Sequence, residues 1–216
     1  MNATKSIIAT AVLTAFTASA AWAQATSDWR PTKTVRIVVP IVGSTNDVLA
    51  RLLAPKLQEA LGQPFVVENK GGAGGNIGAL DVVKSPPDGH TLLVGYNGPL
   101  AINVTLFDNM PYDPMKDLAP ITLAVKSPQY LVVNPATGIT SVQDFIAKAK
   151  ANPTKYSYGS VSLGSASHLT MEMMKSEAGF RMTHIPYRGA GPAVADLLAG
   201  NVQAGFFVPG NVQGFV

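Results

Sequence analysis

A glycine-rich loop is the stretch of this sequence best suited to binding chemistry. Gly71-Gly72-Ala73-Gly74-Gly75 has four glycines in five positions, and it stands between an apolar run at residues 65–67 and a helical pattern from Asn76 onward. Without Cβ atoms, the backbone N–H groups of such a loop can approach a ligand closely and point at it. A glycine run can also be a flexible connector. Anion binding and simple connection are therefore both open for this loop.

Two further loops have related chemistry. Gly43-Ser44-Thr45-Asn46 follows an apolar run at residues 35–39, and Gly95-Tyr96-Asn97-Gly98 follows another at residues 91–94. Both runs have the composition of buried strands. Because the carboxyl ends of parallel strands meet at one edge of a sheet, we expect the three loops to gather on one rim.

Strands and helical patterns alternate along the chain. This alternation predicts an α/β fold with mostly parallel sheets covered on both faces. The predicted strands are 35–39, 65–67, 91–94, 118–125, 130–133, 156–159, 182–185 and 202–207, and the predicted helices start at 47, 76, 141, 169 and 192. In the first helix we expect one buried apolar stripe, made of Val48, Leu49, Leu52, Leu53, Leu57 and Leu61.

The N-terminus and the composition limit the class of protein. Lys5, an apolar run at residues 7–20 and Ala21-Trp22-Ala23 together predict a cleavable signal peptide at residues 1–23 and export to the periplasm. The 216 residues contain no cysteine, which excludes disulfides and thiolate metal sites. The net charge is only +3, and no stretch of the sequence gathers Lys and Arg as nucleic-acid binding requires. We expect no membrane anchor, no cofactor and no metal. The predicted lobes are residues 24–123 and 124–216.

The order of short motifs resembles the Bug family, whose members are extracytoplasmic solute receptors similar to the binding protein of tripartite tricarboxylate transporters. The motifs that carry the resemblance are Val38-Val39-Pro40, Asp47-Val48-Leu49-Ala50-Arg51, Leu61-Gly62-Gln63-Pro64, Val66-Val67-Glu68-Asn69, Gly72-Ala73-Gly74-Gly75-Asn76-Ile77-Gly78, Pro87-Asp88-Gly89, Pro111-Tyr112-Asp113-Pro114, Ser167-His168-Leu169 and His184-Ile185-Pro186-Tyr187. The resemblance implies a monomeric Venus flytrap, not an enzyme. It implies two α/β lobes that close on a small carboxylate and deliver it to a membrane transporter.

The resemblance also places ligand-binding residues in both lobes, with the carboxylate held mostly by backbone amides, hydroxyls and water. The implied residues are Gly43, Ser44, Thr45, Asn46, Asp47, Gly72, Ala73, Gly74, Gly75, Asn76 and Asn97 in the first lobe, and Ser162, Gly164, Ser165, Ser167, Tyr187, Arg188 and Phe207 in the second. Two departures stand out. The first loop is shorter than in other members, and Phe207 replaces an Asp or Asn. The second departure favours a solute with a neutral or apolar body.

Family members continue beyond the point that corresponds to Val216, so the resemblance implies a first lobe that is incomplete at its C-terminal side. A truncated receptor without function is therefore one alternative. Another is a nucleotide-binding oxidoreductase, because Gly72-x-Gly74-x-x-x-Gly78 follows a strand. No acidic residue ends the next strand at the distance that a dinucleotide fingerprint requires. A serine hydrolase is disfavoured because no G-x-S-x-G motif surrounds Ser165 or Ser167.

Overall fold

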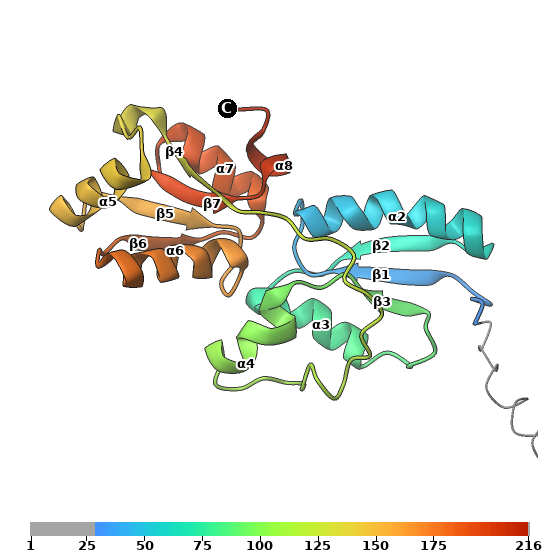
Figure 1. Ribbon diagram of the computed structural model, residues 1–216. Helices are drawn as coiled ribbons and strands as arrows, with labels where there is room; N and C mark the ends of the chain where they lie inside the picture. The colour runs from blue at the N-terminus through green and yellow to red at the C-terminus, as the bar shows by residue number, and fades with distance from the viewer. Residues whose placement is uncertain (1–28, 216) are drawn as a thin grey trace, which may run out of the picture. The chain divides into compact units, whose positions relative to one another are not determined.

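The computed structural model describes residues 29–215 (Figure 1). The chain divides into two units, Met1–Arg30 and Pro31–Val216, and the second contains all the strands and helices discussed below. The signal peptide expected at residues 1–23 lies outside the described residues.

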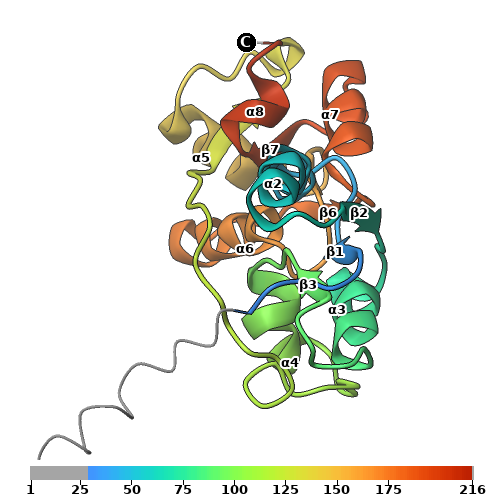
Figure 2. The same cartoon turned by 90° about the vertical axis from the view of Figure 1, so that its right-hand side faces the viewer.

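The first sheet is a parallel sheet of three strands with its most apolar strand in the centre. Its strands are β1 (Val35–Val39), β2 (Phe65–Asn69) and β3 (Thr91–Leu93), in the order β2-β1-β3. Side chains alternate between the faces of β1, so Val35, Ile37 and Val39 pack towards α2 (Thr45–Leu61), whereas Arg36 points to α3 (Asn76–Val83). Figures 1 and 2 accordingly show β1 between these two helices.

Helix α2 has standard caps at both ends. The Ser44 hydroxyl accepts a hydrogen bond from the Asp47 amide at its start, and Gly62 ends it in a left-handed conformation. The predicted apolar stripe is partly wrong, because Val48 is 55% exposed and Leu52 is 65% exposed. The small residue Ala50 instead faces the sheet, and positions two residues away lie about 200° around the helix from it.

The second sheet has four strands, β4 (Tyr130–Val133), β5 (Ser157–Ser160), β6 (Thr183–Pro186) and β7 (Ala204–Phe207). Their order is β4-β7-β5-β6, and only β4 runs antiparallel to its neighbour. Helices α5 (Val142–Ala151) and α6 (Ala166–Ala178) cover one face, and α7 (Ala190–Ala199) and α8 (Pro209–Val212) cover the other. The expected α/β fold with mostly parallel sheets is confirmed.

The strand predicted at residues 118–125 is absent. Residues 118–129 form an irregular exposed segment, in which Ile121 is 80% exposed, and no described residue bonds to its backbone. A β-prone sequence forms a strand only when a neighbouring strand pairs with it. The lobe boundary at residues 123/124 stays a prediction.

Several short elements complete the described part of the chain. They are a 3₁₀ turn at Ala73–Gly75, a π-helical turn at Gly98–Ile102 that continues into α4 (Asn103–Leu106), and a second 3₁₀ turn at Pro135–Thr137.

Candidate functional site

Hydrogen bonds join the three loops at the carboxyl edge of the first sheet. The Asn46 amide of the first loop donates to the Gly95 carbonyl of the third loop at 2.6 Å. The Tyr96 hydroxyl of the third loop donates to the Gly74 carbonyl of the glycine loop at 2.7 Å. The expectation that these loops gather on one rim is therefore confirmed.

Asp47 holds the first loop in shape. Its carboxylate accepts hydrogen bonds from the Gly43 amide at 2.9 Å, from Asn69 Nδ2 at 3.0 Å and from Arg51 Nε at 3.1 Å. Burial alone would raise the pKa of Asp47, but these donors hold it below its ordinary value. An ionised carboxylate repels an anion, so Asp47 shapes the loop for such a ligand instead of touching it. The N–H groups of Thr45 and Asn46, in the first turn of α2, have no acceptor among the described residues.

The glycine loop has an unusual backbone. Four consecutive residues have positive φ angles, 120° at Gly72, 48° at Ala73, 62° at Gly74 and 89° at Gly75. The loop closes with a hydrogen bond from the Gly75 amide to the Gly72 carbonyl at 2.9 Å. The N–H groups of Ala73 and Gly74 are left without an acceptor among the described residues. A Cβ atom at Gly75 would lie 2.7 Å from the Tyr96 hydroxyl, so this loop has a defined shape that requires glycine.

A buried amide supports the glycine loop. Asn103, in α4, is fully buried, and its Nδ2 donates to the Gly74 carbonyl at 2.9 Å and to Asn76 Oδ1 at 2.6 Å. The Tyr112 hydroxyl also lies 3.2 Å from Asn76 Oδ1. The amide of Asn76, a predicted ligand residue, is thus occupied by protein groups. Sequence reasoning missed Asn103, although a polar residue within the apolar run at 100–106 was a signal.

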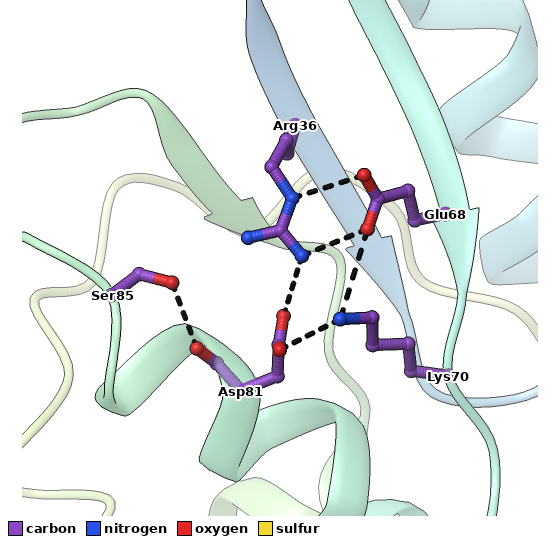
Figure 3. A network of polar contacts seen from close by, with 5 residues as sticks. All are labelled: Arg36, Glu68, Lys70, Asp81 and Ser85. Carbon is purple, nitrogen blue, oxygen red and sulfur yellow. Dashed lines mark hydrogen bonds and ion pairs between the residues drawn. The ribbon is translucent and has the colours of Figure 1, made fainter.

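An ion-pair network fixes the two ends of the glycine loop (Figure 3). Arg36 on β1 binds Glu68 on β2 through two hydrogen bonds, at 3.0 and 2.8 Å, and binds Asp81 on α3 at 2.7 Å. Lys70, which precedes the loop, also binds Asp81 at 2.7 Å. The hydrogen bond from Lys70 is the main cause that lowers the pKa of Asp81, and the one from Arg36 lowers the pKa of Glu68. The network therefore ties the residue before the loop to the helix after it.

On the second sheet, a serine loop, defined here as residues 160–168, joins β5 to α6. The Ser165 hydroxyl donates to the Ser162 carbonyl at 2.6 Å, so the Ser167 hydroxyl, 2.9 Å away, donates to Ser165. Ser167 in turn accepts from the Val161 amide at 3.0 Å. Both hydroxyl hydrogens are used within the loop, so Ser165 and Ser167 shape it. The N–H groups of Ser162 and Leu163 have no acceptor among the described residues.

The remaining predicted residues have different environments. The Tyr187 hydroxyl donates to Asp196 at 2.6 Å. Arg188 and Asn97 are exposed, and their side chains make no hydrogen bond or ion pair with the described residues. Phe207 is 1% exposed and packs with Val194 and other residues in the core against α7, so its placement gives no support for a contact with solute.

Glycines occur where the loops of the two sheets approach each other. A Cβ atom at Gly74 would lie 3.1 Å from the Leu163 carbonyl, and one at Gly164 would lie 2.5 Å from Asn103 Oδ1. A side chain at Gly164 would collide with the buried Asn103 amide. The glycine loop and the serine loop thus come together through positions that lack side chains.

Other kinds of site receive less support. A hollow of about 590 Å³ is lined by apolar residues of the α4 region, Tyr112 and Asp113, and it includes no predicted ligand residue. Within residues 29–215, no cluster of His, Asp or Glu has metal-binding geometry. None of the helices in this part of the chain is long and apolar enough to cross a membrane.

Comparison with known proteins identifies the family. Residues 49–213 match the model of the tripartite tricarboxylate transporter family receptor. Protein BugT of Bordetella pertussis is 41% identical over 207 residues, which are 94% of this chain and 63% of that protein. The chain thus spans less than two thirds of the length of this relative.

Solved structures give the same result. The structure of Rpa4515 from R. palustris with adipate has a TM-score of 0.82 and 39% identity over 87% of this chain and 62% of that one. The periplasmic binding protein BugD has a TM-score of 0.80 and 33% identity over 86% and 62% of the two chains. Members of the matched family are receptors and not enzymes, which argues against the oxidoreductase alternative. The chain belongs to the tripartite tricarboxylate transporter receptor family, which includes the Bug proteins.

Proposed function

We propose that this chain is the solute-binding part of a periplasmic receptor that captures a small carboxylate and delivers it to a membrane transporter. The observation that carries the proposal is a set of backbone N–H groups on neighbouring loops that have no acceptor within residues 29–215. They belong to Thr45 and Asn46 at the start of α2, Ala73 and Gly74 in the glycine loop, and Ser162 and Leu163 in the serine loop.

Hydrogen bonds from these amides supply enough free energy for micromolar binding of a carboxylate. A hydrogen bond to a charged group contributes about 1.5 to 3 kcal/mol, so four of them supply about 6 to 12 kcal/mol before ordering costs. Micromolar binding needs about 8 kcal/mol. The start of α2 adds a favourable helix dipole. An anion can therefore be held here without an arginine in direct contact.

The predicted site residues then fall into two groups. We assign direct contact to the backbone N–H groups of Thr45, Asn46, Ala73, Gly74 and Ser162 and to the side chains of Asn97 and Arg188. The amides of Gly43, Gly75 and Gly164 already donate to Asp47, to the Gly72 carbonyl and to His168, so these glycines shape the loops. We assign a supporting role to the side chains of Asp47, Asn76, Ser165, Ser167 and Tyr187, which already bind protein groups. Arg188 suits a second anionic group of the solute, such as the distal carboxylate of a dicarboxylate.

Support for the solute class comes from relatives. A similar solved protein holds adipate, and the matched family takes its name from tricarboxylates. The resemblance to periplasmic binding proteins and the signal-like pattern at residues 1–23 support export to the periplasm. We propose that the receptor acts as a monomer.

A thermal-shift screen tests the proposal. Adipate and a panel of mono-, di- and tricarboxylates are compared at millimolar concentration, with adipamide as the uncharged control for adipate. A ligand that binds with micromolar affinity stabilises the folded state by about 4 kcal/mol at a thousandfold excess, so the melting temperature should rise by several degrees. If no carboxylate raises it, the receptor function is contradicted.

Gly74→Ala supplies the matched test of the loop. Gly74 has φ = 62°, and a Cβ atom there would lie 3.2 Å from Asn103 Nδ2. Gly62→Ala is the control, because Gly62 has a similar φ of 77° but nothing within 4 Å of its Cβ position. Both substitutions strain the backbone. Only Gly74→Ala should reduce the thermal shift by the carboxylate.

A further inference from the structure

Two stacked histidines, one on α6 and one on β6, contact the serine loop at Gly164 and at Ser160. His168, in the first turn of α6, is buried, and its Nδ1 accepts a hydrogen bond from the Gly164 amide at 3.2 Å. His184, on β6, has its Nε2 2.7 Å from the Ser160 hydroxyl. The two ring centroids are 4.1 Å apart with an interplanar angle of 9°. The chain segment between Ser160 and Gly164 is therefore held by one histidine at each end.

The hydrogen bonds define the protonation state of His168. The N–H group of Gly164 can only donate, so Nδ1 of His168 must carry no proton. Protonation would place an N–H group opposite an N–H group, and the hydrogen bond would be lost. The neighbouring peptide carries the Leu163 amide, which has no acceptor among the described residues. A change at His168 thus reaches the part of the loop that presents free N–H groups.

The charged groups around the histidines do not supply a free counter-ion. Glu172 and Lys175 lie on α6, and Tyr158 on β5 stacks on His184 with centroids 4.8 Å apart. Glu172 accepts hydrogen bonds from the Tyr158 hydroxyl and, at 2.7 and 2.9 Å, from Lys175 Nζ, so its charge is already paired. Burial lowers the pKa of His168. Burial and the second ring lower the pKa of His184 to about 4.

We propose that His168, stacked on His184, is a positioning residue that keeps the serine loop in its ligand-binding shape only while the His168 ring is neutral. This inference rests on the proposed binding of a carboxylate by that loop. It gives His168 a role besides packing: the affinity of the protein for a carboxylate falls as the pH falls. Protonation of His168 at Nδ1 removes the acceptor of the Gly164 amide, so it is sufficient to release that end of the loop.

Calorimetric titration with adipate at about pH 7.5 and about pH 5 tests the role of His168, because the pKa of His184, about 4, leaves that ring mostly neutral at both pH values. Affinity should fall by up to about tenfold for each pH unit below the pKa of the responsible histidine. His168→Asn retains an acceptor oxygen near the position of Nδ1 and cannot be protonated, so its affinity should change less with pH. The protonation of adipate itself affects both proteins equally and cancels in this comparison. His168→Leu should bind weakly at both pH values.

His90→Asn is the matched control. His90 accepts a hydrogen bond from the Thr32 amide at 3.1 Å, and it lies outside the serine loop. Its substitution should leave the pH dependence of the wild type unchanged. The proposal is wrong if His168→Asn loses affinity in acid as strongly as the wild type does.

Amide hydrogen exchange at Gly164, followed by NMR without ligand, separates this proposal from the proposed function. The Gly164 amide should be protected in the wild type and in His168→Asn at about pH 7.5, and unprotected in His168→Leu. In acid, the protection factor should fall only in the wild type. If protection follows His168 but no protein binds adipate at either pH, the receptor function fails and the positioning role stands. Equal protection in all three proteins overturns the positioning role.

Discussion

At the scale of single residues, side chains that look suited to ligand binding mostly hold loops. Asp47, Asn76, Ser165 and Ser167 each use their polar atoms on neighbouring protein groups. Beside them lie backbone N–H groups that have no acceptor among the described residues. Under the proposed function, these side chains act on a carboxylate only through the backbone that they hold in place.

Asn103 provides a test of such support. Its amide holds the Gly74 carbonyl and Asn76, and substitution by leucine removes both hydrogen bonds at similar volume. We expect Asn103→Leu to lower the free energy of unfolding by about 1 to 3 kcal/mol, because buried acceptors lose a partner. We also expect adipate affinity to fall at least about tenfold, equivalent to about 1.4 kcal/mol, because the glycine loop loses its shape. Urea unfolding and calorimetric titration measure the two effects.

Asn134→Leu is the control for Asn103→Leu. The Asn134 amide is also buried and donates to the Leu197 carbonyl at 2.7 Å, but it follows β4 and makes no hydrogen bond to the glycine or serine loop. A comparable loss of stability with unchanged affinity is expected. If the two variants bind adipate equally well, Asn103 does not position the glycine loop.

At the scale of elements, the strands place three loops on one edge, and the Arg36 network fixes the glycine loop between β2 and α3. The residues of this network, Arg36, Glu68, Lys70 and Asp81, are about 30% exposed, so each pair is screened only in part. The network connects three elements that are distant in the sequence. Its loss should loosen α3 relative to the sheet.

Asp81→Asn tests this network. The substitution removes one of its two carboxylates and leaves Arg36 and Lys70 with Glu68 alone. We expect a loss of about 1 to 2 kcal/mol in the free energy of unfolding, reduced at high salt. Glu59→Gln, which breaks the exposed pair with Lys56 at 3.8 Å, should cost less than about 0.5 kcal/mol. Equal effects of the two substitutions in urea unfolding would show that the network contributes no more than a surface ion pair.

At the scale of the whole molecule, the prediction of two lobes depends on the irregular segment at residues 118–129. This segment contains Lys126 and has no backbone hydrogen bonds to the described residues. Trypsin should therefore cut first after Lys126, at a protease-to-protein ratio too low to cut the helices. Mass spectrometry of the fragments identifies the first cut, and Lys126→Gln should remove it. First cuts within α2 or α5 would contradict two lobes joined at this segment.

Local patterns in the sequence were sufficient to predict most of the strands and helices. Most strands and helices were predicted to within a few residues, because β-branched runs, serine caps and terminal glycines act through neighbouring residues. The segment at 118–125 failed because strand formation depends on a partner. Val48 and Leu52 were assigned to the core because apolar character alone does not show which face of a helix meets the sheet.

The sequence by itself determined where loops rich in glycine, serine and asparagine occur, since these residues have local conformational effects at strand ends. Only the tertiary structure decided which atoms those loops leave free. Asn103 reaches the glycine loop and Tyr112 reaches Asn76 beside it from later in the chain, and His184 on β6 stacks on the ring of His168 on α6. Such contacts depend on how the elements pack, because residues far apart in the sequence become neighbours only in the folded chain.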